Sequence, residues 1–201
     1  MNPYRGKRAL DLLVAGTAGV LFAPVAAAVT IAVWLDDGAA PLFSQPRVGR
    51  GREPFTILKF RTLRASTVTR VGQCLRHTGI DELPQFVNVC RGQMSVVGPR
   101  PLTATDVARL GWSDAAHDWR FSAKPGITGL SQLLTGRGAR SSERLDRLYL
   151  RRQSLCLDVQ LIALSLAVNV LGKRRVRRWI RGKPCGRLMV TAGRRRMSVR
   201  S

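Results

Sequence analysis

The chain has 201 residues, 45% of them hydrophobic, which is enough for one domain with a packed core and excludes a wholly disordered protein. Its 34 Lys and Arg against 12 Asp and Glu give a formal net charge of +22, which indicates a polyanionic partner: nucleic acid, an anionic membrane or phosphorylated small molecules. The four cysteines are widely spaced and there are only two histidines, so the sequence lacks the ligand spacing of a structural zinc site.

The first distinctive segment is residues 12–35, an uncharged run of 24 residues that is long enough for a membrane helix. A signal peptide would have an apolar core of only roughly 7–15 residues, so a retained membrane segment is the better interpretation. Pro24 lies in its middle, where proline kinks or breaks a helix. Three basic residues precede the run and three follow it, which sets no direction across the membrane. These features favour a re-entrant helix broken at Pro24, with a kinked spanning helix as the alternative.

A strand is expected at residues 55–62, where the side chains alternate in character. One face of this strand would carry Phe55, Ile57, Lys59 and Arg61. A short helix is expected over residues 70–78.

Pro84 determines where the next helix begins, because proline is harmless only in the first turn. The helix is therefore expected to start near Asp81. Beyond it, the pattern predicts a short strand within residues 92–101, a helix over 102–121 and a rigid loop at 124–129.

Two further helices are expected near the C-terminal end, one from Ser141 and one from Ser154. The second is mostly apolar, with Asp158, Ser165 and Asn169 on one stripe, which suits a helix in the membrane interface or packed under the domain. The last segment, 172–201, has twelve Lys or Arg and no acid. It is either a solvated tail or a segment drawn to anionic lipid by about 1 kcal/mol per basic residue.

Asp81 and Glu82 are the only acids between Pro54 and Thr105, a stretch with seven basic residues. Acidic pairs are common at solvated helix starts, because carboxylates favour the first turn. Among arginines, however, the same pair suits a Mg²⁺ site that also receives phosphates, and a carboxylate can act as a nucleophile. Nearby arginines are expected to keep Asp81 ionised.

Seven motifs occur in a fixed order along the chain: KRALD (7–11), LFAPV (21–25), PLFSQPRVGRG (41–51), KFRTL (59–63), LRHTGIDELPQFVNVCRGQMSVVGPRP (75–101), KPGITGLSQ (124–132) and LDRLYLRRQSLCLDVQLI (145–162). In these motifs the chain resembles the bacterial sugar transferases, which are monotopic polyprenyl-phosphate phosphoglycosyl transferases. The resemblance extends from about Tyr4 to Gly172. Ala23 stands where the family usually has serine, so the predicted helix break rests on Pro24 alone.

The resemblance implies an α+β, mainly helical fold with three parts. These are a re-entrant membrane segment (1–37), a catalytic domain with interfacial amphipathic helices (38–171) and a basic tail (172–201). It also implies a location on the cytoplasmic face of the bacterial inner membrane, with anionic lipids as partners.

The implied reaction moves a sugar 1-phosphate from a UDP-sugar to polyprenyl (undecaprenyl) phosphate and releases UMP, as the first membrane step of glycoconjugate assembly. Asp81 would be the nucleophile and form a covalent phosphosugar intermediate, and Glu82 with Asp81 would hold an essential Mg²⁺. The implied phosphate-binding residues are Arg76, Arg100, Lys59 and Arg61. Asp146 matches a family acid that is either a helix salt-bridge partner or a support for the active site.

Two other classes remain as alternatives. A basic nucleic-acid-binding protein would explain the charge but not the uncharged run, so no nucleic acid is expected. A non-catalytic membrane scaffold with the same fold would keep the motifs without turnover.

Overall fold

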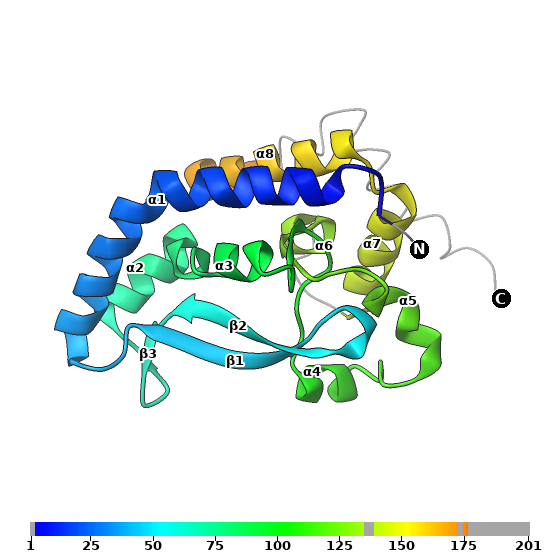
Figure 1. The fold of residues 1–201 in the computed structure, drawn as a ribbon. Coiled ribbons are helices and arrows are strands. Elements are labelled where there is room, and N and C mark those ends of the chain that lie inside the picture. The colour runs from blue at the N-terminus through cyan, green and yellow to red at the C-terminus, as the bar shows by residue number, and fades with distance from the viewer. Residues whose placement is uncertain (1–2, 135–138, 173–174, 177–201) are drawn as a thin grey trace.

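The computed structural model describes residues 3–134, 139–172 and 175–176, and these form one body of helices around small sheets (Figure 1). The longer helices are α1 (Lys7–Asp37), α2 (Arg70–Thr78), α7 (Ala139–Arg152) and α8 (Leu155–Leu171). The shorter ones are α3 (Gln85–Cys90), α4 (Ala104–Arg109), α5 (Asp118–Phe121) and α6 (Leu130–Leu134). The α+β, mainly helical class is confirmed, whereas most of the predicted basic tail, 173–174 and 177–201, lies outside the described residues.

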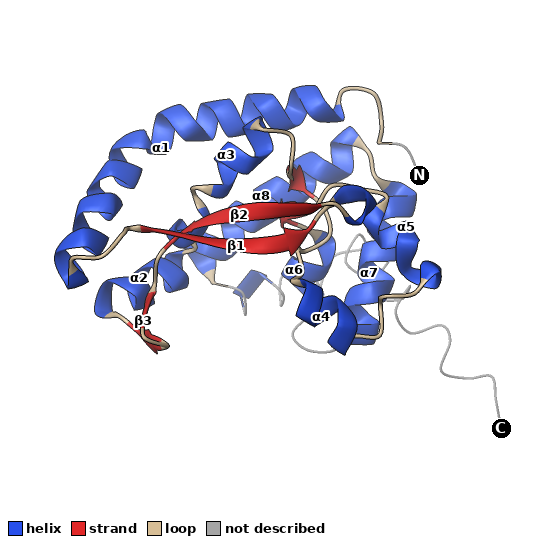
Figure 2. Ribbon diagram, turned by 60° about the horizontal axis from the view of Figure 1, so that its bottom comes forward, coloured by secondary structure: helices blue, strands red, loops and turns tan. Residues whose placement is uncertain are grey.

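Strands pair two by two within this described part of the chain. The antiparallel pairs are β1 (Leu42–Val48) with β2 (Pro54–Phe60) and β3 (Leu63–Arg64) with β4 (Thr67–Val68). The parallel pair is β5 (Ser95–Val97) with β6 (Gly126–Thr128). Figure 2 shows the β1–β2 ribbon crossing the body below α1.

Helix α1 continues through Pro24 for 31 residues and changes direction along its length (Figure 1). The sequence predicted a break at Pro24, but the structure has a bend within one helix. Proline removes a single helical hydrogen bond and displaces the preceding turn, and the rest of the hydrogen-bond ladder remains.

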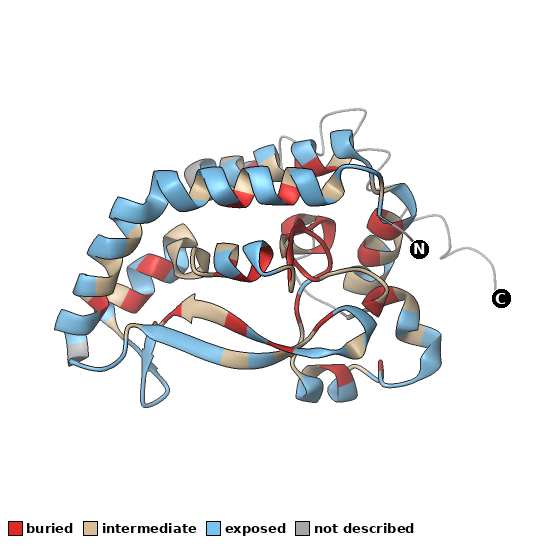
Figure 3. Cartoon of the chain, in the orientation of Figure 1, coloured by how far each residue is buried: buried red, intermediate tan, exposed pale blue. Residues whose placement is uncertain are grey.

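Both halves of α1 pack against the same body. Ala15, in the first half, is buried in the main core, and Val33, in the second half, is buried against Phe60 and Leu75. Between the two contacts, every residue from 19 to 25 is exposed, and Figure 3 shows how much of α1 is uncovered. The bend therefore wraps the domain on its inner side and presents apolar surface on its outer side.

Helix α8 begins after Ser154, whose Oγ accepts a hydrogen bond from the Leu157 N–H, as the sequence predicted. Its Asp158 is fully buried and accepts hydrogen bonds from Lys7 Nζ at 2.7 Å and from Tyr4 Oη and Tyr149 Oη, both at 2.9 Å. The polar stripe of α8 thus begins inside the domain at Asp158. Four large apolar residues of α8 are left exposed: Leu155, Val159, Leu166 and Leu171.

The predicted rigid loop at 124–129 is wrong in part, because Gly126–Thr128 is strand β6, paired in parallel with β5. A Cβ at Gly126 would lie 2.1 Å from the Gly98 nitrogen, so this close backbone approach requires glycine. The predicted helix over 102–121 is also interrupted. Helix α4 ends before Gly111, which has a φ of +70°, and α5 starts at Asp118.

Candidate active site

The acidic pair lies in a single 3₁₀ turn, η2 (Ile80–Glu82), between α2 and α3. The helix that was expected to start near Asp81 starts instead at Gln85, with Pro84 as its N-cap residue. Gly79 closes α2 in a left-handed conformation with a φ of 74°, and the chain re-enters helical geometry as the tighter 3₁₀ turn. Asp81 and Glu82 are therefore held on a short, partly buried turn rather than on a regular helix.

Strand β2 brings Lys59 to this turn. Its Nζ lies 2.7 Å from Glu82 Oε1, and both side chains are only partly exposed, at 21% and 33%. The side chain of Ile57, two residues earlier on the same face, is buried at 1% exposure. Strand β2 thus supplies a buried apolar side chain, Ile57, and a cation, Lys59, that pairs with Glu82 of the acidic turn.

Burial and the neighbouring Glu82 raise the pKa of Asp81 above its ordinary value, against the opposing effects of Lys59 and Arg76. Of the nearby arginines that were expected to keep this carboxyl ionised, Arg76 does lower its pKa, but burial and Glu82 have the larger effect. The physical reason is desolvation, which penalises the charged form of a half-buried carboxylate.

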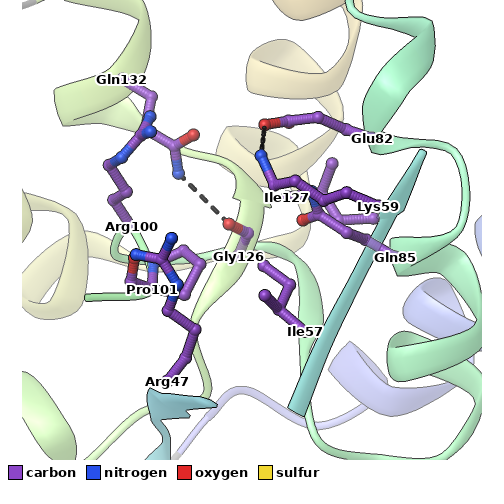
Figure 4. A pocket seen from close by; sticks show the side chains of 10 residues that line it. All are labelled: Arg47, Ile57, Lys59, Glu82, Gln85, Arg100, Pro101, Gly126, Ile127 and Gln132. Carbon is purple, nitrogen blue, oxygen red and sulfur yellow. Dashed lines mark hydrogen bonds and ion pairs between the residues drawn. The ribbon is translucent and has the colours of Figure 1, made fainter. Parts of the chain in front are cut away.

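A cleft opens beside Glu82 and holds about 270 Å³ of space that is continuous with solvent (Figure 4). Arg47 and Arg100 lie on one side of it, and Lys59, Glu82 and Gln85 on the other. The full lining is Arg47, Ile57, Lys59, Glu82, Gln85, Arg100, Pro101, Gly126, Ile127 and Gln132. Asp81 is adjacent to this lining through Glu82 and is not itself part of it. Three cations and one carboxylate around one cleft make an anion a suitable ligand for it.

Two predicted phosphate-binding residues lie outside the lining. Arg76 is exposed, and its Nε donates to Thr62 Oγ1 at 2.8 Å, but it is close enough to Asp81 to lower the pKa of that carboxyl. Arg61 donates from Nε to the Ala40 carbonyl at 2.7 Å and from Nη2 to the Ala39 carbonyl at 3.0 Å. Arg61 thus holds the loop after α1, and these contacts do not bring it to the cleft.

Arg100 is supported from behind by a buried ion pair between helices α5 and α7. Arg120 donates from Nη2 to the Arg100 carbonyl at 2.8 Å, and its Nε lies 3.0 Å from Asp146 Oδ2. The Arg120 and Asp146 side chains are 5% and 3% exposed. Asp146 is therefore the long-range partner of Arg120, and through it supports the backbone at the edge of the cleft.

Sequence reasoning missed Arg47, Gln85 and Gln132. Gln85 follows Asp81 by four residues and Glu82 by three, a helical spacing that could have placed it beside them. Arg47 comes from β1, a strand that was not predicted because Pro46 interrupts its pattern. Burial and the neighbouring Arg100 lower the pKa of Arg47, which is a further sign that cations are concentrated here.

A bound Mg²⁺ would take its protein ligands from Asp81 and Glu82. Among residues 3–134, 139–172 and 175–176, no group of three or more His, Cys, Asp or Glu side chains is arranged to hold a metal ion. Two adjacent carboxylates, Glu82 in the cationic cleft and Asp81 next to it, match the way Mg²⁺ binds where substrate phosphates supply the other ligands. The donor set therefore fits a magnesium ion that arrives with a phosphorylated substrate, not an all-protein cage.

Comparison with known proteins gives a consistent result. Residues 3–172 match the model of the family described as bacterial sugar transferase. A UDP-glucose:undecaprenyl-phosphate glucose-1-phosphate transferase of Caulobacter vibrioides is 40% identical over 174 residues, 78% of this chain and 62% of that protein. A UDP-N-acetylgalactosamine-undecaprenyl-phosphate N-acetylgalactosaminephosphotransferase of Aeromonas hydrophila is 34% identical over 83% of this chain and 44% of its own length.

A UDP-glucose:undecaprenyl-phosphate glucose-1-phosphate transferase of Escherichia coli is 31% identical over 83% of this chain and 40% of its own length. The chain thus spans 40% to 62% of the length of these three relatives. The family match covers most of the chain, including the acidic turn, the cleft and α1. The chain belongs to the bacterial sugar transferase family.

Proposed function

We propose that this protein transfers a sugar 1-phosphate from a UDP-sugar to undecaprenyl phosphate and releases UMP. The observation that carries the proposal is the half-buried Asp81–Glu82 turn beside a cleft lined by Arg47, Lys59 and Arg100. This arrangement combines a nucleophile with cations for a diphosphate, and the relatives at 31% to 40% identity have names that describe this reaction.

The transfer proceeds in two displacements at the sugar-bearing phosphorus. An Asp81 carboxylate oxygen first attacks this phosphorus, and the bond to the oxygen that bridges the two phosphates breaks, so that UMP leaves with the electron pair. An oxygen of undecaprenyl phosphate then attacks the same phosphorus, and the bond to Asp81 breaks. Asp81 regains its carboxylate, and the lipid carries the sugar on a diphosphate.

Lys59, Arg47 and Arg100 stabilise the negative charge on the phosphoryl oxygens during both displacements. Because Lys59 is paired with Glu82 at 2.7 Å, it is held in place before substrate arrives. Mg²⁺ held by Glu82 and Asp81 would supply additional positive charge at these oxygens.

We further propose that the protein lies monotopically on the cytoplasmic face of the inner membrane, with α1 dipping into one leaflet. Both halves of α1 pack on the same body, which supports placing both its ends on one side. The most apolar stretch of α1 is long enough to cross a membrane and only 6% of it is buried. Replacing Leu21 and Phe22, both exposed near the bend, by Ser should move protein from the membrane fraction into detergent-free supernatant.

Activity is tested by incubating purified full-length protein with Mg²⁺, undecaprenyl phosphate and a panel that includes UDP-glucose and UDP-N-acetylgalactosamine, and measuring UMP release. Release that requires both substrates supports the proposal, and its absence with every donor would contradict it. Mass spectrometry of protein quenched with UDP-sugar alone should find a sugar-phosphate adduct on Asp81. Asp81→Asn, which preserves shape but removes the nucleophile, should lose both the adduct and turnover.

If Asp81→Asn behaved like the wild type, the non-catalytic scaffold would be the better reading. Salt-dependent DNA binding without UMP release would instead favour the nucleic-acid alternative.

A further inference from the structure

Two residues that line the cleft, Gln85 and Arg47, each have a buried side-chain nitrogen without a hydrogen-bond partner, and the Gln85 amide is the uncharged one. Gln85 is the first residue of α3, is 2% exposed and lines the cleft beside Lys59 and Glu82 (Figure 4). Its Nε2 is buried without a hydrogen-bond partner, one of three such side-chain atoms in the described part of the chain. Buried donors are almost always paired, because a donor that gives up its hydrogen bond to water without forming another one incurs the full free-energy cost of desolvation. An unpaired one at a substrate cleft indicates that the missing acceptor belongs to the substrate.

Gln85 lines the same cleft as Lys59 and Glu82. It follows Asp81 by four residues in the chain, with the 3₁₀ turn η2 ending at Glu82 and α3 beginning at Gln85. The Glu82 carboxylate, which lines the same cleft, accepts a hydrogen bond from Lys59 at 2.7 Å. The other amide of the cleft, Gln132, donates from Nε2 to the Gly126 carbonyl at 3.2 Å, whereas the Nε2 donor of Gln85 has no hydrogen-bond partner.

We propose that Gln85 Nε2 donates a hydrogen bond to a nonbridging oxygen of the phosphoryl group that is being transferred. The inference rests on the proposed phosphoglycosyl transfer. The acceptor is a phosphoryl oxygen because Arg47, Lys59 and Arg100 surround the cleft and select an anion at this place. Gln85 adds a directed donor there without adding charge, which orients the phosphoryl group and stabilises it as the nucleophile approaches.

The test compares Gln85→Met with wild-type enzyme on UDP-sugars in which sulfur replaces one nonbridging oxygen of the sugar-bearing phosphate, using each diastereomer separately. Methionine keeps the length of the side chain and removes the donor. Sulfur accepts hydrogen bonds weakly, so a variant that has already lost the donor should be less sensitive to it. We expect Gln85→Met to lower kcat/KM on the normal substrate by about tenfold to 100-fold. We expect the ratio of kcat/KM for the oxygen substrate to kcat/KM for the sulfur substrate to be at least severalfold lower in Gln85→Met than in the wild type, for one diastereomer only.

Gln132→Met is the matched control, because it removes the other amide of the cleft. Its oxygen-to-sulfur ratios should equal those of the wild type for both diastereomers. Gln85→Asn, which keeps the amide but withdraws it by one methylene, should give an intermediate ratio, and it serves in place of Gln85→Met if that variant turns over too slowly to measure.

Unchanged ratios for both diastereomers in Gln85→Met would overturn the proposal. If those ratios stayed unchanged while the ranking among UDP-sugars altered, the amide would instead bind a sugar hydroxyl, and the proposal would also be wrong. A lower thermal midpoint with unchanged ratios would assign Gln85 to the fold alone. Wild-type UMP release is measured in the same assay, so a failure of the transferase function is seen separately from a failure of the role given to Gln85.

Discussion

Replacing Asp146 by Ala tests whether the buried ion pair behind the cleft holds the domain together. The pair joins α7 to α5, with Asp146 Oδ2 at 3.0 Å from Arg120 Nε and both side chains at most 5% exposed. Burial raises the pKa of Asp146 and lowers that of Arg120, although each is opposed by the other's charge. Removing one partner of such a pair leaves an uncompensated buried charge, which costs about 3–5 kcal/mol.

The matched control is Glu143→Ala on the same helix. Glu143 Oε1 also pairs with an arginine, Arg147 Nη2 at 3.2 Å, but this pair is 27% and 43% exposed. A surface pair of this kind contributes about 0–1 kcal/mol. Both variants replace an arginine-paired carboxylate on one helix by alanine, and their stabilities should differ by about 2–5 kcal/mol.

The assay is chemical denaturation of the detergent-solubilised protein followed by tryptophan fluorescence, because Trp112 lies 5.1 Å from the Arg120 guanidinium carbon and reports on this region. A loss of about 3–5 kcal/mol in the free energy of unfolding also corresponds, in a thermal melt of a domain of this size, to a midpoint lower by roughly 6–20 °C. Equal losses in Asp146→Ala and Glu143→Ala would refute the reasoning. Because Arg120 also binds the Arg100 carbonyl at 2.8 Å, the Asp146 variant should in addition raise the KM for UDP-sugar.

Two other predictions follow from contacts near the acidic turn. Gly72→Ala would place a Cβ 2.2 Å from the Thr62 carbonyl oxygen, so denaturation should show that the free energy of unfolding falls by about 1–3 kcal/mol or more. Its control is Gly19→Ala in α1, where a Cβ would have nothing within 4 Å and the free energy of unfolding should not fall. Lys59→Met removes the 2.7 Å partner of Glu82 and should lower kcat for UMP release more than tenfold. The guanidinium of Arg61 contacts the Ala39 and Ala40 carbonyls, so Arg61→Met should leave KM near the wild-type value. A similar kinetic loss in both variants would contradict the placement of Arg61 away from the cleft.

The elements that the sequence predicted well are those with local signals. Helix α8 follows a serine N-cap, and α7 carries its apolar residues at helical spacing. Strand β6 was read as a loop because its signal is not local. Its partner β5 lies about thirty residues away in the chain, and two facing glycines, Gly98 and Gly126, allow the approach. The spacing of residues within 124–129 does not indicate which distant segment this strand will pair with.

The site divides in the same way. Asp81, Glu82 and Lys59 were identified from the concentration of charge and from strand alternation, and the structure brings Lys59 to Glu82. The same alternation placed Arg61 on that face, but β2 ends at Phe60, so the alternation stops one residue too early for Arg61. Gln85 carries no charge and was passed over, although an unpaired buried amide becomes visible as soon as the cleft is assembled.

The contacts of α1 argue that this apolar helix is part of the folded domain rather than a removable leader. Arg8 donates to the Val89 and Cys90 carbonyls at 2.6 and 2.9 Å, which satisfies carbonyl groups at the C-terminal end of α3. Asp11 Oδ1 accepts from Ser95 Oγ and from the Val96 N–H, both at 2.9 Å, in a buried position. Loss of this segment would leave these groups unpaired inside the protein, at a cost of about 1–3 kcal/mol each. The first turns of α1 are therefore fixed to the C-terminal end of α3 and to β5, and its second half packs through Val33 against Ile80 and Leu83 beside the acidic turn. If α1 enters one leaflet as proposed, these contacts would hold the acidic turn near the bilayer surface, where a lipid phosphate is found.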